Sequence, residues 1–456
     1  MRKTLLLCFP LLAIAIGPGL AAPAGAATAG PTMLADSTFA QDWKLANGLR
    51  VVTRHIPHSR GVAMTLAYDV GGDDDPPGRE GLAMLLAEVG FTAAAGEIPE
   101  RSRSELASQR PLGWSFLPTR RTTMFTEIST PAQFPGMLKE IATRMRGVTV
   151  SREGLREALG NVRAQMADRL AGPPAVSLYY QVRELAAGHD DRALLRGAPG
   201  RELERMTPVE IQKEVARLFV PANAVLSLAG DLEGVDVPAL VQNLFGSLPA
   251  GAPATRAPRD SLRAGARLVK VPGVNQRRGV VGIIAPPLTD PGHPAFYLCS
   301  MLLGTHFSQA WAPGDQPAAA PGAAFHYALF DEPDLVRLFP PGGATTDDLG
   351  TLVKAAVNQL YSMVVPKEAF DQMRVGLAWL LGGPMTEAQL ERTRTDASAL
   401  HTLSRSMAGR ELFGGEAVWA PYRERFGQLP PGGFQTWMDY YLAPEHQVRL
   451  IAAPNR

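Results

Sequence analysis

The chain has 456 residues, of which 46% are hydrophobic and 20% are charged. This composition is too apolar for an intrinsically disordered protein, and the length exceeds what one small hydrophobic core serves, so two or more domains are expected. The 45 basic and 44 acidic residues give a net charge of +1 and form no long run of one sign. This pattern excludes nucleic-acid binding through a basic face.

The N-terminus has the features of a secretory signal peptide. Two basic residues open the chain, an apolar stretch over residues 5–16 follows, and small residues up to Ala26 fit an A-x-A cleavage site. The apolar stretch is too short to span a bilayer. We therefore expect residues 1–26 to be a cleaved signal peptide, and the mature protein to be periplasmic or secreted by a bacterium, with no stable membrane span. Cys8 leaves with this peptide, and Cys299, inside an apolar run, is expected to be a small buried side chain.

Strands and helices are predicted to alternate irregularly along the first half. Apolar alternation predicts a strand over 62–70, and helical spacing of apolar residues predicts a helix over 81–89. A strand over 121–129 and a long helix over 151–170 follow. Thr207–Glu210 is a capping box with proline at the first helical position, which predicts the start of another helix. The order favours an α+β fold with mostly antiparallel strand pairing over a strict βαβ series.

Several segments of the first half recur in the second half at nearly constant spacing. A proline turn followed by a strand occurs in both halves, and so does a pair of short apolar strands near the start of each half. The paired segments are 221–230 with 444–453, 50–53 with 268–271, and 61–64 with 279–282. A repeat of this length predicts two homologous domains, each a mostly antiparallel sheet packed with helices.

The predicted domain boundaries follow from this repeat and from composition. Residues 248–263 are rich in proline, glycine and alanine, as linkers are. We therefore expect an N-terminal domain over 27–247, a linker over 248–263 and a C-terminal domain over 264–456.

The segment Gly81-Leu82-Ala83-Met84-Leu-Leu-Ala87-Glu88-Val-Gly-Phe91 resembles the active-site helix of the pitrilysin/insulinase family of zinc metallopeptidases. The family pattern is Gly-Leu-Ala-His-x-x-Glu-His-x-x-Phe. Further matches follow in the family's order and cover nearly all of the mature chain. They are Tyr68–Gly72, Gly188-His189, Met206–Glu210, Phe219–Asn223, Ala229–Asp231, Asn275-Gln276, Asp290 and Leu302–Gly304.

The resemblance implies a zinc site whose positions are altered in this chain. The family's two histidines and its catalytic glutamate correspond to Met84, Glu88 and Ala87, and its third ligand falls near Ala164 or Gln165. A thioether is a poor ligand for Zn²⁺, and alanine has no carboxylate to act as a general base. We therefore expect the catalytic residues to be degenerate, and no cofactor to be bound.

Active relatives also use an arginine and a tyrosine of the second domain to hold the substrate backbone. This chain has no Arg or Lys between Arg278 and Arg337, and a loop rich in proline and alanine over 311–322 takes the expected place. Tyr327 is the candidate for the substrate-binding tyrosine.

Other constellations of catalytic or metal-binding residues have weaker support. No pair of the eight histidines has the i, i+4 spacing of a helical zinc site, and there is no Gly-x-Ser-x-Gly or Gly-x-x-x-x-Gly-Lys motif. Asp73-Asp74-Asp75 lacks the spacing of a calcium loop and is expected to be a solvated loop.

The resemblance leads to one main hypothesis and two alternatives. In the main hypothesis the chain is a non-catalytic subunit of an exported zinc metallopeptidase, which closes the chamber and binds peptide or unfolded protein beside an active paralogue in a heterodimer. In the first alternative it is an active zinc metalloendopeptidase with a rebuilt site, formed by Glu88, Glu157 and a distant histidine. In the second it is a peptide-binding or scaffolding envelope protein with no peptidase partner. Zinc is expected only in the first alternative.

Overall fold

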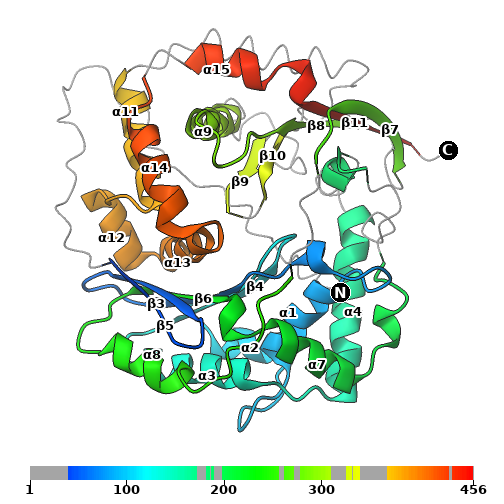
Figure 1. Ribbon diagram of the computed structural model, residues 1–456, viewed down its shortest axis with the longest axis vertical. Helices are drawn as coiled ribbons and strands as arrows, with labels where there is room; N and C mark the ends of the chain where they lie inside the picture. Colours follow the sequence, from blue (N-terminus) through cyan, green and yellow to red (C-terminus); the bar gives the residue numbers. More distant parts are fainter. Residues whose placement is uncertain are drawn as a thin grey trace, which may run out of the picture.

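Two β-sheets and the helices around them make up the computed structural model (Figure 1). The predicted signal peptide and residues 256–260 of the predicted linker lie outside the described residues. The structure describes residues 40–171, 181–184, 186–188, 198–255, 261–271, 278–309, 325–330, 332–338, 367–430 and 434–454.

The N-terminal sheet has six strands in the order β1-β2-β6-β3-β5-β4. β2 and β6 run parallel, and the other neighbours run antiparallel. The strands are β1 Ala40–Lys44, β2 Arg50–His55, β3 Val62–Tyr68, β4 Trp114–Pro118, β5 Thr123–Ser129 and β6 Ala224–Gly230.

The C-terminal sheet has five described strands in the order β7-β11-β8-β10-β9. Its pairing repeats that of the first sheet, because β7 and β11 run parallel as β2 and β6 do, and the other neighbours run antiparallel. A proline-led 3₁₀ turn precedes the last strand of both halves, η3 before β6 and η5 before β11. The predicted α+β fold with two homologous domains is confirmed. The strands are β7 Gly265–Val271, β8 Arg278–Ile284, β9 Phe325–Ala328, β10 Glu332–Leu338 and β11 Gln447–Pro454.

The helices follow the apolar spacing and caps of the sequence. The Thr207 hydroxyl caps α7 by accepting a hydrogen bond from the backbone N–H of Glu210, and the Thr207 N–H donates to the Glu210 carboxylate, as predicted. The described helices of the first half are α1 Leu82–Thr92, α2 Arg103–Gln109, α3 Phe134–Arg146, α4 Arg152–Ala171, α7 Pro208–Leu218 and α8 Val237–Phe245. Those of the second half are α9 His293–Gln309, α11 Lys367–Ala378, α12 Glu387–Thr395, α13 Ala397–Leu412, α14 Gly415–Gly427 and α15 Phe434–Tyr441. Short 3₁₀ turns are η1 Gly72–Asp74, η2 Leu203–Arg205, η3 Pro221–Asn223, η4 Trp379–Leu381 and η5 Pro444–His446.

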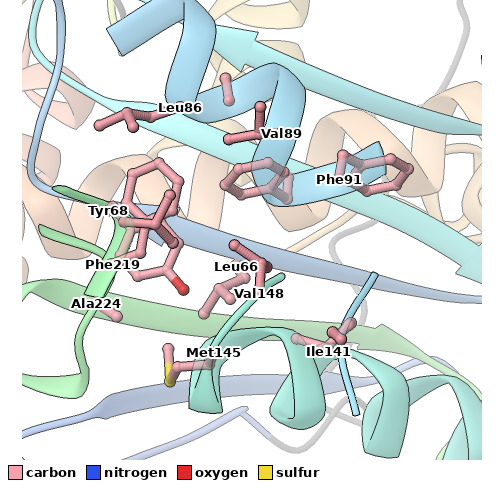
Figure 2. Close-up of a cluster of buried hydrophobic side chains, with 14 of the residues drawn as sticks. Leu66, Tyr68, Leu86, Val89, Phe91, Ile141, Met145, Val148, Phe219 and Ala224 are labelled. Carbon is pink, nitrogen blue, oxygen red and sulfur yellow. The ribbon is translucent and has the colours of Figure 1, made fainter. Parts of the chain in front are cut away.

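One face of the N-terminal sheet packs on helices of its own half and forms the largest hydrophobic core (Figure 2). The ring of Tyr68 on β3 stacks on that of Phe219, with ring centroids 4.4 Å apart. Figure 2 shows this core around Leu66, Tyr68, Leu86, Val89, Phe91, Ile141, Met145, Val148, Phe219 and Ala224. Residues 82–91 of helix α1 are all buried.

The opposite face of each sheet is covered by a helix from the other half. α12 and α13 of the second half lie over the N-terminal sheet, where Leu403 and Met407 join a core with strand residues such as Ala63 (Figure 1). Helical residues 181–184 and 186 of the first half lie against the C-terminal sheet, where Val182 packs with residues of β8, β10 and β11. This exchange explains why all seven residues of β3 are buried rather than alternating between core and solvent.

The exchange also means that the two halves share their cores. The predicted boundaries at 247 and 264 remain predictions, and each half depends on a helix beyond its own boundary. None of the helices in the described part of the chain combines the length and apolar character needed to cross a membrane.

Candidate functional site

The first backbone amides of helix α1 donate hydrogen bonds to the carboxylate of Asp75, which defines where the helix begins. Asp75 accepts hydrogen bonds from the backbone N–H groups of Gly81, at 2.7 Å, and Ala83, at 2.8 Å. Gly81 adopts the left-handed conformation, with φ of +95°, which glycine takes at little cost. Burial raises the pKa of Asp75 to about 7, against the opposing effect of these bonds.

The prediction that Asp73-Asp74-Asp75 is a solvated loop is wrong. Asp73 pairs with Arg120, Asp74 accepts a bond from the backbone of Gly71, and Asp75 caps α1. These three carboxylates are partly buried, and their bonds hold the turn η1 and the first residues of α1 in place.

The residues at the expected zinc positions lie on α1 and are buried. Met84 is 7% exposed, Ala87 0% and Glu88 1%. Gln165 is half-buried on α4, and the accompanying residue Ala164 is exposed. Met84 and Ala87 belong to the hydrophobic core, so two of the three α1 positions contribute packing rather than polar chemistry.

The carboxylate of Glu88 is held by two side chains from other helices. Arg103 of α2 donates from Nε to Oε1 at 2.7 Å and from a terminal nitrogen to Oε2. Asn161 of α4 donates from Nδ2 to Oε1 at 2.8 Å. The guanidinium of Arg103 also lies over the ring of Phe116 on β4, 5.0 Å from its centroid. We call Glu88, Arg103 and Asn161 the Glu88 cluster.

The Glu88 cluster compensates the free-energy cost of burying the ionised carboxylate of Glu88. An ionised carboxylate without a partner is costly in a low-dielectric interior. A bidentate guanidinium supplies one compensating positive charge and matches the carboxylate geometry. Arg103 therefore supplies the positive charge that balances the carboxylate of Glu88.

A second buried ion-pair cluster lies at the sheet side of the same core. Glu127 on β5 accepts a bond from Nε of Arg110 at 2.6 Å, and the same arginine donates to Glu140 at 2.7 Å. Burial raises the pKa of Glu127, and the neighbouring Arg110 opposes that rise.

The residues at the expected zinc positions do not fit Zn²⁺. Structural and catalytic zinc sites use three or four thiolate, imidazole or carboxylate donors. Here one position offers a thioether, one offers no donor, and both carboxylate oxygens of Glu88 are bonded to the guanidinium of Arg103. A zinc ion at Glu88 would have to displace that guanidinium. Within the described residues there is no cluster of three or more His, Cys, Asp or Glu side chains that could hold a metal ion.

Two of the remaining candidates lie away from α1 or outside the described side chains. Glu157 is exposed on α4, whereas Glu88 is fully buried. Tyr327 lies in strand β9, and its side chain is outside the described part of the structure. The loop over 311–322 is also outside it. Cys299 is a free, buried thiol, 3% exposed, as predicted.

Sequence reasoning missed the two partners of Glu88. Arg103 lies fifteen residues after Glu88 on another helix, at no helical spacing from it. Asn161 lies on α4, the helix on which the third zinc ligand is expected, one turn before Gln165. The available clue was the acidic residue itself, because a glutamate in an apolar helix requires a cation or hydrogen-bond donors nearby.

Comparison with known proteins shows which fold this chain shares. Residues 205–313 match the model of the Peptidase M16 inactive domain. A search of curated proteins found no match for this chain. Among solved structures, a protease from Helicobacter pylori is 16% identical with a TM-score of 0.72, and the alignment covers 91% of this chain and 100% of that one.

Two further solved structures show the same fold at similar identity. The Peptidase M16 inactive domain from Pseudomonas fluorescens is 16% identical with a TM-score of 0.62, over 92% of this chain and 98% of that one. The periplasmic protease PqqL from Escherichia coli is 14% identical with a TM-score of 0.62, over 93% of this chain and 48% of that one.

The chain is M16-like. The predicted resemblance to the pitrilysin/insulinase family is confirmed, since the family model and the similar structures are of M16 type. The matched segment of the M16-like chain runs from η2 of the first half to beyond α9 of the second. The match therefore spans the junction between the halves and does not include α1.

Proposed function

We propose that this M16-like chain is the non-catalytic subunit of an exported peptidase, which closes a chamber and binds peptide beside an active paralogue. The observation that carries the proposal is the Glu88 cluster. The helix that would present the zinc ligands instead presents two apolar side chains and a glutamate bonded to Arg103 and Asn161. Neither a metal-bound water nor a general base can form from this set of side chains.

One similar structure suggests how an active unit could lie beside this one. The chain corresponds to 48% of the PqqL chain, which is described as a periplasmic protease. A protein of about twice this length has room for two such units in one polypeptide. In such an arrangement, a unit without catalytic side chains would lie beside a unit that has them. The expected signal peptide and the periplasmic description of PqqL both favour export.

The alternative of an active enzyme with a rebuilt zinc site has less support. It requires Glu88 and Glu157 to meet at one ion, but Glu88 is buried and bonded to Arg103 whereas Glu157 is exposed on another helix. Bringing them together would expose a helix that belongs to the largest core.

An affinity pull-down of the mature chain from its native envelope extract tests the proposal. The expected result is a stoichiometric partner that carries the His-x-x-Glu-His motif, with peptide cleavage by the pair but not by this chain alone. Recovery of the chain alone, or with an unrelated envelope protein, would overturn the subunit proposal and favour a peptide-binding or scaffolding role.

The variant Ala87→Glu is a matched probe for the cleavage assay. It restores a carboxylate at the general-base position, and because Ala87 is fully buried, an unfolding curve of the variant must show that it remains folded. We expect no gain of cleavage by the isolated chain, because Arg103 still holds Glu88 and the two histidine positions remain Met84 and Glu88.

A further inference from the structure

A row of hydroxyl side chains crosses the N-terminal sheet on one face. Ser115 of β4 lies opposite Thr126 of β5. Thr126 lies opposite Thr65 of β3, and Thr65 lies opposite Ser227 of β6. Residues that are directly opposite each other in neighbouring strands point to the same face of a sheet. We call this line of four side chains, Ser115, Thr126, Thr65 and Ser227, the hydroxyl row.

Helix α13 of the second half lies over the hydroxyl row and bonds to it. The helix contacts β3, β5 and β6 (Figure 1). Oγ of Ser404 donates to Oγ1 of Thr65 at 2.8 Å and lies 3.4 Å from Oγ of Ser227. The hydroxyl groups of Thr65 and Thr126 share a hydrogen bond of 3.1 Å. The three inner members of the row and Ser404 therefore form one polar cluster between the two halves.

This polar cluster lies within an apolar interface. Thr65, Thr126, Ser227 and Ser404 are all 0% exposed. Side chains two positions apart on a strand share a face, and the residues two before and two after each inner member of the row belong to the core that α13 shares with the sheet. These flanking residues are Ala63 and Ala67 on β3, Met124 and Ile128 on β5, and Val225 and Ala229 on β6.

Buried hydroxyl groups distinguish positions of α13 that apolar packing distinguishes weakly. Apolar contacts have no preferred direction, whereas a buried hydroxyl left without a bond costs stability. Four residues before and after Ser404, on the same face of the helix, are Leu400 and Ala408, both buried and apolar. Ala408 is close to serine in size. Only Ser404 can bond to Thr65, so a displacement of the helix by one turn would lose that bond.

We propose that the hydroxyl row is a positioning device that fixes α13 in one place on the N-terminal sheet. Because the row belongs to the first half and α13 to the second, it also fixes how the two halves are held together. Setting the register of a helix is the best-attested role of buried polar groups. His401, one turn before Ser404, shares a 2.9 Å bond with the hydroxyl of Ser115 and provides a second attachment at the β4 end of the row. The inference does not depend on the proposed function.

The first test compares two serine-to-alanine variants of the same helix in the mature chain. Ser404→Ala removes the hydroxyl that meets the row, and the control Ser406→Ala removes another hydroxyl of a buried residue on α13. We expect Ser404→Ala to raise the equilibrium constant for unfolding about tenfold more than Ser406→Ala does, because it takes the bond from the buried Thr65. Chemical denaturation measures both constants.

The second test measures where α13 lies. Spin labels on cysteines introduced at Lys139 of α3 and Ser398 of α13, both exposed, report the distance between helices of the two halves by pulsed electron paramagnetic resonance. The parent chain with these labels is expected to give one narrow distribution of distances. A displacement of α13 by one turn would move its label by about 5 Å.

The variant for this second test is Thr65→Val/Thr126→Val/Ser227→Ala/Ser404→Ala, which makes the interface apolar with little change in side-chain volume. Removing all partners of a hydrogen bond together is often close to neutral in stability. We therefore expect this fourfold variant to be more stable than Ser404→Ala alone, and yet to give a wider distribution of label distances than the parent chain.

Two results would overturn the proposal. One is a distribution as narrow in the fourfold variant as in the parent chain, because apolar packing would then set the position of α13. The other is an equal effect of Ser404→Ala and Ser406→Ala on unfolding. If the fourfold variant does not fold, the same labels in Ser404→Ala decide the question: a wider distribution than in the parent chain supports the proposal, and an unchanged one overturns it.

Discussion

Under the N-terminal sheet, helix α1 buries the carboxylate of Glu88 against a guanidinium and an amide. Under the C-terminal sheet, helix α9 contains no aspartate, glutamate, lysine or arginine. Its first residue, His293, is fully buried and shares a 2.8 Å hydrogen bond with the hydroxyl of Tyr422 on α14. One helix thus depends on an ion pair and the other on a bond between two aromatic side chains.

This difference shows that two halves with the same strand order can bury different chemical groups. The strands of both halves pair in the same way, but only the N-terminal half has a charged group in the helix under the sheet. A buried charge must be compensated, so removing its partners Arg103 or Asn161 is expected to cost much stability. Removing one partner of a neutral hydrogen bond between two aromatic side chains is expected to cost less. The predictions below measure that difference.

Arg103→Ala has the largest expected effect. It leaves Glu88 buried without its cation, so we expect the free energy of unfolding to fall by about 3–5 kcal/mol. Chemical denaturation measures this loss. The control Arg156→Ala removes an ion pair between exposed side chains and is expected to cost no more than about 1 kcal/mol. Equal losses in the two variants would contradict a special role for the Glu88 cluster.

The double variant Glu88→Met/Arg103→Met sharpens this point. Replacing a buried ion pair by apolar side chains of similar volume is often close to neutral. We therefore expect the double variant to be clearly more stable than Arg103→Ala alone, as measured by the same denaturation curves. If it is no more stable, the loss in Arg103→Ala comes from packing and not from an unpaired charge.

Leu403→Ala probes the helices that the two halves exchange. Leu403 of α13 is fully buried against the N-terminal sheet, so we expect the variant to lose about 2–5 kcal/mol of unfolding free energy. Val182→Ala at the reciprocal contact removes fewer atoms and is expected to cost less. A single cooperative unfolding transition in the parent chain, monitored by two spectroscopic probes, checks that the halves unfold together. Two separate transitions would show that the shared cores do not couple them.

His293→Phe tests the neutral counterpart in the C-terminal half. It leaves the buried hydroxyl of Tyr422 without this bond, and we expect a loss of about 1–3 kcal/mol in thermal or chemical unfolding. The loss should shrink when Tyr422→Phe is added, because the hydroxyl that made this bond is then gone. A loss larger than that of Arg103→Ala would reverse the comparison between α1 and α9.

The smallest expected effect is a pH dependence from His401 on α13. Burial, together with the nearby Arg405, lowers the pKa of His401 from 6.5 to about 4, and its Nε2 lies 2.9 Å from the hydroxyl of Ser115 on β4. The folded chain therefore binds fewer protons than the unfolded chain between these values, so stability is lost as pH falls through this window. We expect His401→Gln to lose about 1 kcal/mol less than the parent chain between about pH 7 and about pH 5.5. Denaturation curves at both pH values that shift equally would contradict this.

Much of the fold could be predicted from sequence because local rules determine it. The capping box at Thr207, the helical spacing of apolar residues in α1 and the repeated proline turns all act over a few residues. The exchange of α13 and of the helical segment that contains Val182 and Ala186 between the halves could not be predicted, because it depends on contacts between residues far apart in the chain.

The site was predictable in part for the same reason. The replaced positions Met84, Ala87 and Glu88 lie within one short motif. The partners of Glu88 lie on α2 and α4, and only the packing of three helices brings them together. The role of Asp75 was missed because its bonds to α1 cross a turn rather than follow helical spacing.

The most direct test of the account is the zinc content of the purified mature chain, measured after equilibration with zinc and removal of free metal, together with peptide cleavage by the same sample. The account predicts no stoichiometric zinc and no cleavage by the chain alone, because Arg103 is bonded to both carboxylate oxygens of Glu88. One zinc per chain, with cleavage that is lost in Glu88→Ala, would contradict it.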